Sequence, residues 1–393
     1  MNILFISPWY PNRYDSMAGL FVQKHAEAVS LYADVKVLYV HPDVSINHFE
    51  TVVNHHNKLE EFHIYYPASN RSIIKKIING INFLKAYKQG FDRLNKTGWK
   101  ADILHTNVLT RTPFIGFINK ITTGTPYVIT EHWTKFLKVR NDFKGIGRKI
   151  LARMVVKNAS YILPVSIELL EGLKFNNLLL TKYEIIENVV DKCFYIRYAV
   201  EKKIHKKQII NITCFYEKQK NLFGLLRAVK EISGLRDDFE LILIGEGNDF
   251  EITKTYCSSL NLPDGMIHFA GLKTSEQVAK IMQSADFVVQ FSNYESAGVV
   301  VEEALVSGKP VISTRVGLAP DFINDTNGLL VEAGNEAQLV AAIHKVLDNL
   351  ENYNSEEIKK NASELFSYEH IGRKIMDIYD EILNNSKQNI SEK

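Results

Sequence analysis

Features that mark secreted and membrane-spanning proteins are scarce in this 393-residue chain. It has only three cysteines, an odd number at wide spacing, which argues against a disulfide framework and against a zinc site. No apolar run approaches the roughly 18–20 residues that a helix needs to cross a bilayer. The first apolar segment is short, lacks a basic leader and meets Pro8 at once, so we expect no signal peptide. These absences favour a cytoplasmic protein.

Chemical motifs of several protein classes are also missing. The sequence contains no Asp-x-Asp and no His/Cys cluster at ligand spacing, so we expect neither a metal site nor another cofactor. No Gly-x-Gly-x-x-Gly follows the first strand-like segment, which argues against a dehydrogenase. Stacking aromatics are not interleaved with the basic residues, so we expect no nucleic-acid partner.

Acidic residues are absent between Glu61 and Asp92, in a chain whose halves differ in charge. Residues 1–192 carry 25 basic and 16 acidic side chains, a net charge of +9, whereas residues 193–393 carry a net charge of −7. The basic residues within the acid-free interval are Arg71, Lys75, Lys76, Lys85 and Lys88.

Two interpretations of this basic segment stay open. Isoleucines lie among the basic residues, which is typical of an amphipathic helix on an anionic membrane surface or beside a lipid-linked acceptor. Alternatively, the isoleucines pack on a sheet and the lysines face water. The same two interpretations apply to a second basic run, Lys135 to Lys157, and there the alternative is slightly favoured.

Short apolar, β-branched runs alternate with longer amphipathic segments along the whole chain. In the N-terminal half we expect strands at 3–6, 35–40, 62–66, 103–104, 127–130 and 161–164, and helices at 20–30, 73–87 and 147–158. In the C-terminal half we expect strands at 209–215, 241–244, 267–269, 287–290, 310–313 and 328–331, and helices at 222–232, 275–282, 299–306 and 337–347. Such alternation indicates parallel sheets covered on both faces, and therefore an α/β chain of two Rossmann-like, doubly wound domains.

The strongest chemical signal lies after the expected strand at 287–290. Glu295 and Glu303 flank a small-residue loop, Ser296-Ala297-Gly298, and a helix follows from Val299 and Val300. Free N–H groups and the dipole at a helix start favour an anion such as pyrophosphate. The two carboxylates could accept hydrogen bonds from sugar and ribose hydroxyls. Taken alone, the segment also fits a plain strand–loop–helix turn with two solvated glutamates.

This Glu-x7-Glu element, followed by Ser307-Gly308-Lys309-Pro310, resembles the retaining glycosyltransferases of family 4, which have the GT-B fold. The family order continues with Gly245 after one strand, His268 in the next strand and Asn188-Val189-Val190-Asp191 at the domain junction. The resemblance implies two domains that face each other across a cleft. Residues 1–190 would bind the acceptor, residues 191–365 the nucleotide sugar, and 366–393 would form a helix that returns to the N-terminal domain and frays after Asn384.

The resemblance also implies an activity. It predicts metal-independent transfer of a sugar, with retention, from a nucleotide-diphosphate donor, and it favours a UDP-sugar over a GDP-sugar. The acceptor would be a glycan or a lipid-linked molecule in cell-surface polysaccharide or glycolipid synthesis. The enzyme would be cytoplasmic, with peripheral binding to the inner face of an anionic membrane.

The resemblance further assigns residues to the site. His132, in Thr130-Glu131-His132-Trp133, takes the place of the family's active-site histidine, although the pattern alone favours a strand-end histidine bonded to backbone. His105, which ends another strand, is expected to be structural. The implied catalytic residues are His132 and Glu295, and the implied donor-binding residues are Gly19, Lys220, Gly245, His268, Ser296, Ala297, Gly298, Val299, Val300 and Glu303.

One departure from the family concerns the diphosphate clamp. The family carries Gly-Arg before a Lys-Gly or Lys-Asn pair, and Lys220-Asn221 fits only the second half of that pattern. The position of the arginine falls on Cys214 or Phe215, so bidentate phosphate binding is lost, because lysine acts as a point charge. The incomplete clamp leaves open a catalytically silent partner subunit. A nucleotide-sugar epimerase of similar two-domain fold also stays open as an alternative.

Overall fold

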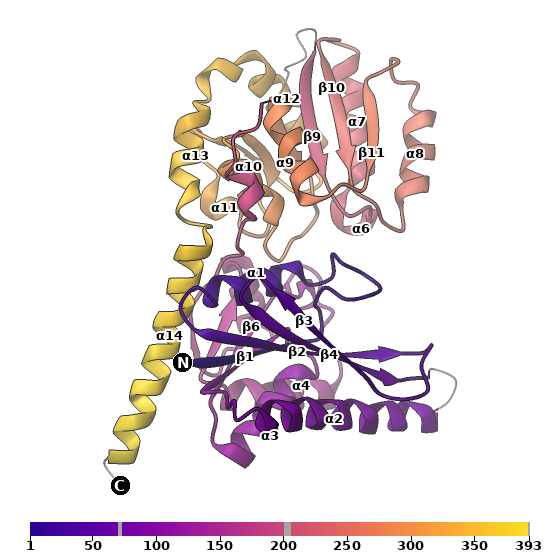
Figure 1. Ribbon diagram of the computed structural model, residues 1–393. Coiled ribbons are helices and arrows are strands. Elements are labelled where there is room, and N and C mark those ends of the chain that lie inside the picture. The colour runs from indigo at the N-terminus through magenta and orange to yellow at the C-terminus, as the bar shows by residue number, and fades with distance from the viewer. Residues whose placement is uncertain (70–72, 200–205, 392–393) are drawn as a thin grey trace. The chain divides into compact units, whose positions relative to one another are not determined.

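The computed structural model describes residues 1–69, 73–199 and 206–391 (Figure 1). The chain forms two compact units, each with its own sheet. The first unit contains Met1–Val165, Leu169–Val189 and Tyr368–Lys393, and the second contains Ser166–Glu168 and Val190–Ser367. Arg71 lies outside the described residues, and so do positions 201–205, which are part of a charged run, 201–207, that the sequence places near the join of the two domains. None of the helices in the described ranges is long and apolar enough to cross a bilayer.

The first unit is built on an eight-stranded sheet with the order β3-β4-β2-β1-β5-β6-β7-β8. Its strands are β1 (Asn2–Ser7), β2 (Asp34–Asp43), β3 (Glu50–His56), β4 (Leu59–Pro67), β5 (Ile103–Asn107), β6 (Tyr127–Glu131), β7 (Tyr161–Pro164) and β8 (Lys182–Tyr183). The expectation of a purely parallel sheet is wrong at one edge, where β3 pairs antiparallel with β4. Most side chains of β3 are exposed, so it has no apolar run that would reveal it in the sequence.

Helices cover both faces of this first sheet. They are α1 (Leu20–Val29), α2 (Ile73–Lys96), α3 (Thr112–Thr123), α4 (Ile146–Asn158), α5 (Ile167–Phe175), α14 (Tyr368–Ser391) and the short η1 (Thr134–Phe136). Ile3 and Phe5 of β1 point into a core shared with α1 and α14. Leu4 points to the opposite face, because strand side chains alternate. Figure 1 shows α2 and α3 on that opposite face.

The C-terminal helix α14 packs directly on α1 within the first unit. Gly372 permits the approach, because a Cβ there would lie 2.4 Å from the backbone oxygen of Ala28. The helix remains regular to Ser391, beyond the position where the sequence predicts fraying.

The second unit has a six-stranded sheet in the order β11-β10-β9-β12-β13-β14, and every neighbouring pair is parallel. The strands are β9 (Lys207–Ile212), β10 (Phe239–Ile244), β11 (Ile267–Gly271), β12 (Phe287–Gln290), β13 (Val311–Thr314) and β14 (Gly328–Val331). This is the order 3-2-1-4-5-6 of a doubly wound nucleotide-binding sheet, with its reversal between β9 and β12. The predicted α/β class with two such domains is confirmed.

Among the helices of the second unit, α10 has the bounds that the sequence predicts. They are α6 (Glu217–Lys220), α7 (Leu222–Ser233), α8 (Phe250–Ser259), α9 (Ser275–Ser284), α10 (Val299–Val306), α11 (Ala319–Phe322), α12 (Glu336–Asp348), α13 (Ser355–Ser363), η2 (Lys192–Phe194) and η3 (Leu350–Asn352). The strand expected at 209–215 is wrong at its end: β9 stops at Ile212, and the chain turns towards α6.

Candidate active site

Two loops of the second unit meet where the strand order reverses. Residues 213–216 lead from β9 into α6, and residues 291–298 lead from β12 into α10. Ligands of doubly wound sheets bind beyond the carboxyl ends of strands at this position. A pocket of about 200 Å³ lies there, lined by Lys220, Gln290, Ser292, Glu295, Ala297, Gly298, Val299, Val300, Val301, Ser313 and Val316.

Lys220 and Glu295 form an ion pair in the wall of this pocket. The Lys220 Nζ lies 2.5 Å from Glu295 Oε1, and the two side chains are only 12% and 13% exposed. Gln219 Nε2 donates to the other carboxylate oxygen at 3.0 Å. Burial lowers the pKa of Lys220, but the neighbouring Glu295 carboxylate more than offsets this, so the net shift is upward. The pocket therefore holds an ammonium that is charged at neutral pH and whose position is fixed by a carboxylate.

The start of α10 supplies the second attractive feature for an anion. Gly298 precedes the helix with a φ of +92°, a left-handed conformation that favours glycine. The first backbone N–H groups of a helix have no carbonyl partner within the helix and carry the positive end of its dipole. Here they line the same pocket as the ammonium of Lys220, so the pocket is suited to a phosphate group.

Four of the donor-binding residues predicted in this unit are not among those lining the pocket. Ser296 and Glu303 lie on the adjoining loop and on α10. Gly245 follows β10, where a Cβ would lie 1.8 Å from the backbone oxygen of Thr213, so it permits close backbone packing. His268 of β11 lies with its Nε2 3.2 Å from Oε2 of Glu240.

The structure also identifies what replaces the missing arginine of the clamp. Phe215 is fully buried and packs against the rings of Phe250 and Phe269 at 4.7 and 6.2 Å between centroids. Cys214 is exposed, and its thiol supplies no positive charge. Lys220 is the only lysine or arginine among the described residues that line the pocket. Of the two positions on which the arginine would fall, Phe215 is part of the hydrophobic core and Cys214 is exposed.

The first unit contains the other two predicted site residues. Gly19 precedes α1 with a φ of +64°, and a Cβ there would lie 2.3 Å from backbone atoms of Trp9. His132 follows β6 and is 6% exposed, with its ring 4.3 Å from that of Phe21. Its Nε2 has no hydrogen-bond partner among the described residues. Burial lowers the pKa of His132 well below its usual range, so the imidazole is neutral at pH 7.

Glu131, beside this histidine, is a residue whose position the sequence reasoning missed. Its buried carboxylate accepts hydrogen bonds from the backbone N–H groups of Leu109, His132 and Trp133, at 2.6, 2.8 and 2.7 Å. Burial raises the pKa of Glu131 to about 7, against the opposing effect of these donors. The carboxylate ties the loop after β5 to the loop after β6. An acidic residue at the end of an otherwise apolar strand is the available sequence signal.

His105 occupies the structural role expected for it. Its Nδ1 pairs with the hydroxyl of Tyr379 in α14, and its Nε2 lies 2.5 Å from Oγ1 of Thr130. Both ring nitrogens are therefore used within the core of the first unit.

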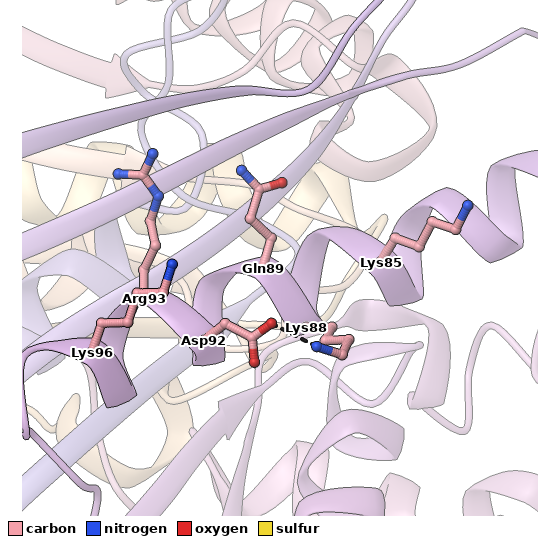
Figure 2. Close-up of a pocket in the computed structure, with 6 residues that line it drawn as sticks. All are labelled: Lys85, Lys88, Gln89, Asp92, Arg93 and Lys96. Carbon is pink, nitrogen blue, oxygen red and sulfur yellow. Dashed lines mark hydrogen bonds and ion pairs between the residues drawn. The ribbon is translucent and has the colours of Figure 1, made fainter.

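The basic residues singled out in the sequence lie on α2. Lys75, Lys76 and Lys85 are exposed, and Lys88 forms an i,i+4 ion pair with Asp92 at 2.6 Å. Figure 2 shows Lys85 and Lys88 beside further basic side chains of the same helix. Among the described residues, no group of three or more His, Cys, Asp or Glu side chains is placed to hold a metal ion.

Comparisons with known proteins agree with this geometry. Residues 198–364 match the family described as glycosyl transferases group 1. An uncharacterized glycosyltransferase of Methanocaldococcus jannaschii is 28% identical over 85% of this chain and 93% of its own length. Residues 198–364, which form most of the second unit, thus match a glycosyl transferases group 1 domain.

One further curated protein and one solved structure are similar to this chain. The lipopolysaccharide core biosynthesis glycosyltransferase LpsD of Rhizobium meliloti is 30% identical over 34% of this chain and 37% of that protein. The Anabaena protein HepE, whose crystal structure contains UDP and glucose, has a TM-score of 0.71 at 15% identity, covering 97% of this chain and 100% of that one. The fold is thus that of the GT-B glycosyltransferases.

Proposed function

We propose that this protein is a glycosyltransferase that transfers a sugar from a UDP-sugar with retention of configuration and without a divalent metal. The observation that carries the proposal is the pocket where Lys220, Glu295 and the start of α10 converge at the strand-order reversal. A UDP donor is favoured because HepE, which has the same fold, was solved with UDP and glucose.

Charge stabilisation is the main task that we assign to the pocket. The leaving diphosphate gains negative charge as the bond to the sugar breaks, and the Lys220 ammonium and the first amides of α10 would meet it. These groups are fixed before the substrate arrives, so little reorganisation accompanies the reaction. The proposal of metal independence rests on this set of positive groups.

The acceptor hydroxyl would lose its proton to the leaving phosphate oxygen on the same face of the sugar. The protein then needs no carboxylate nucleophile, and we assign Glu295 to the hydroxyls of the transferring sugar. His132, a neutral imidazole with a free Nε2 among the described residues, is suited to one hydrogen bond with a sugar hydroxyl. Glu303 lies on the regular helix α10, and we assign its carboxylate to the ribose hydroxyls of the donor.

We further propose a glycan or lipid-linked acceptor and peripheral binding to an anionic membrane through α2. The exposed lysines of α2 and the relation to LpsD support this assignment. Each lysine or arginine near an anionic leaflet contributes about 1 kcal/mol. Vesicles of anionic phospholipid should therefore co-sediment the enzyme at low salt and release it at high salt.

Incubation of the enzyme with UDP-sugars and candidate acceptors, followed by NMR of the anomeric proton, tests the activity. The expected product keeps the donor's anomeric configuration. An inverted product would exclude the retaining mechanism. The fully buried Phe215 favours one second candidate, a catalytically silent subunit. That candidate predicts UDP binding without transfer or hydrolysis of any UDP-sugar.

A further inference from the structure

The first unit contains an apolar groove that the proposed reaction does not use. It lies between α2 and α3 and has a volume of about 780 Å³. Its lining includes Leu4 of β1, Leu104 of β5, Phe91 and Leu94 of α2, and Ile118 of α3. A groove of this size and apolar lining is suited to a hydrocarbon ligand.

A basic depression adjoins the groove on α2. It has a volume of about 370 Å³, and Figure 2 shows all six of its lining side chains on this one helix. Four are basic and one is acidic: Lys85, Lys88, Arg93, Lys96 and Asp92, with Gln89 the sixth. Asp92 pairs with Lys88, which also lines the apolar groove. An anion-binding surface and a hydrocarbon-binding groove therefore share one residue.

An exposed apolar stripe of α2 leads to this groove. Ile77, Ile81 and Leu84 are 62%, 47% and 45% exposed, and Leu84 is also part of the groove wall. Their spacing of four and three residues continues to Lys88 and Phe91, so all five lie on one side of the helix. Exposed isoleucines in a row beside lysines are the pattern of a helix that rests on a bilayer surface.

We propose that the groove and the basic depression together bind one anionic lipid of the membrane surface, with its hydrocarbon chain between α2 and α3 and its phosphate at the basic side chains of α2. The proposal rests on the membrane association proposed above and deepens it. A second copy of the chain is disfavoured as the occupant, because a two-fold contact would bring the same net positive cluster against itself.

Trp99 offers a direct probe of occupancy, because it lines the groove. The other two tryptophans, Trp9 and Trp133, contact each other with ring centroids 5.8 Å apart and do not line it. Monomeric lysophosphatidic acid with a brominated acyl chain should quench Trp99 saturably, and Trp99→Phe should remove most of that quenching. Each added methylene that enters the groove should tighten binding by up to about fourfold.

Matched variants separate the groove from its surroundings. Ile118 lines the groove, whereas Ile121 on the same helix does not and is 67% exposed. Ile118→Glu should weaken lipid binding at least tenfold, and Ile121→Glu should leave it unchanged although it adds the same charge. On α2, the double variant Arg93→Gln/Lys96→Gln should likewise weaken binding of the monomeric lipid. The control pair Lys75→Gln/Lys76→Gln should leave that binding unchanged, because neither residue lines the groove or the depression, although both belong to the surface proposed for vesicle binding.

Four results would overturn the proposal. The first two are an equal loss of lipid affinity in Ile118→Glu and Ile121→Glu, and a lipid affinity that does not depend on the length of the acyl chain. The other two are competition by inorganic phosphate that equals that of the lipid, and a dimer in sedimentation that both isoleucine variants disrupt. Vesicle co-sedimentation distinguishes failure of the proposed lipid site from failure of the proposed membrane association. Vesicle binding without quenching of Trp99 would overturn the lipid site alone, whereas no vesicle binding by the wild type would overturn the association on which it rests.

Discussion

Replacement of Lys220 by methionine tests the proposed donor site most directly, because it removes the one cation found in the pocket lining among the described residues. A hydrogen bond to a charged group contributes about 1.5–3 kcal/mol. Loss of that contribution should raise the Kd for UDP by about 10- to 150-fold. Isothermal titration calorimetry measures the affinity. Lys218→Met is the control, since Lys218 is exposed on the same short helix and does not line the pocket.

The partner of this lysine should behave in the opposite way. Glu295 competes with phosphate for the Lys220 ammonium, 2.5 Å away, so Glu295→Gln should bind UDP as tightly as wild type or more tightly. Turnover of that variant should nevertheless fall by about 10²–10³, the cost of losing one preorganised contact in a transition state. Tighter binding with slower transfer separates a carboxylate that serves the sugar from one that serves the fold.

Stability measurements complete this test. Removal of one partner from a buried ion pair costs about 3–5 kcal/mol, and the slight exposure of this pair places the expected cost at or below that range. The double variant Lys220→Met/Glu295→Gln should therefore lose less stability than the sum of the two single losses, because it leaves no unpaired charge. Wild-type UDP affinity in a folded Lys220→Met protein would refute the assignment of the pocket.

Three other predictions follow from the site and the core. Transfer should persist in EDTA; abolition by the chelator with rescue by Mg²⁺ or Mn²⁺ would contradict the metal-independent proposal. His132→Ala should lower kcat by about 10²–10³ without global unfolding, as checked by circular dichroism. Burial lowers the pKa of His25 to about 4. Its neutral form therefore stabilises the fold above pH 6.5, and about 3 kcal/mol of the free energy of unfolding should be lost as pH falls from 6.5 to 4. Urea unfolding should show a shallower acid loss for His25→Gln than for the exposed-site control His55→Gln, and equal pH profiles would count against the buried neutral imidazole.

The parts of the site that follow one another in sequence were predictable. The strand at 287–290 and the helix at 299–306 were predicted with the bounds that the structure gives to β12 and α10. An apolar strand, a loop of small residues and an apolar helix leave little choice of local structure. The same reasoning placed Gly298 at the helix start, where its positive φ requires glycine.

Other features depend on contacts that no local pattern contains. The expected strand at 209–215 ran too far because Phe215 prolongs the apolar run, although the ring packs on Phe250 from α8 after the chain has left the sheet. The antiparallel strand β3 was not predicted, because its residues form no apolar pattern and only its pairing with β4 makes it a strand. The pairing of Lys220 with Glu295 joins the end of α6 to the loop before α10, and the two residues are 75 positions apart.

That pairing also explains how the site can work with a lysine alone at the clamp. An arginine fixes a phosphate by its own planar geometry, whereas a lysine needs neighbours to fix its position. Glu295 fixes the ammonium of Lys220, and Gln219 in turn fixes Glu295. On the proposed function, a donor diphosphate would replace Glu295 as the partner of Lys220. The carboxylate would then be released beside the pocket at the moment when the sugar arrives. Arrival of the diphosphate would thereby prepare the group that holds the sugar, which is why Lys220→Met should weaken UDP binding and Glu295→Gln should not.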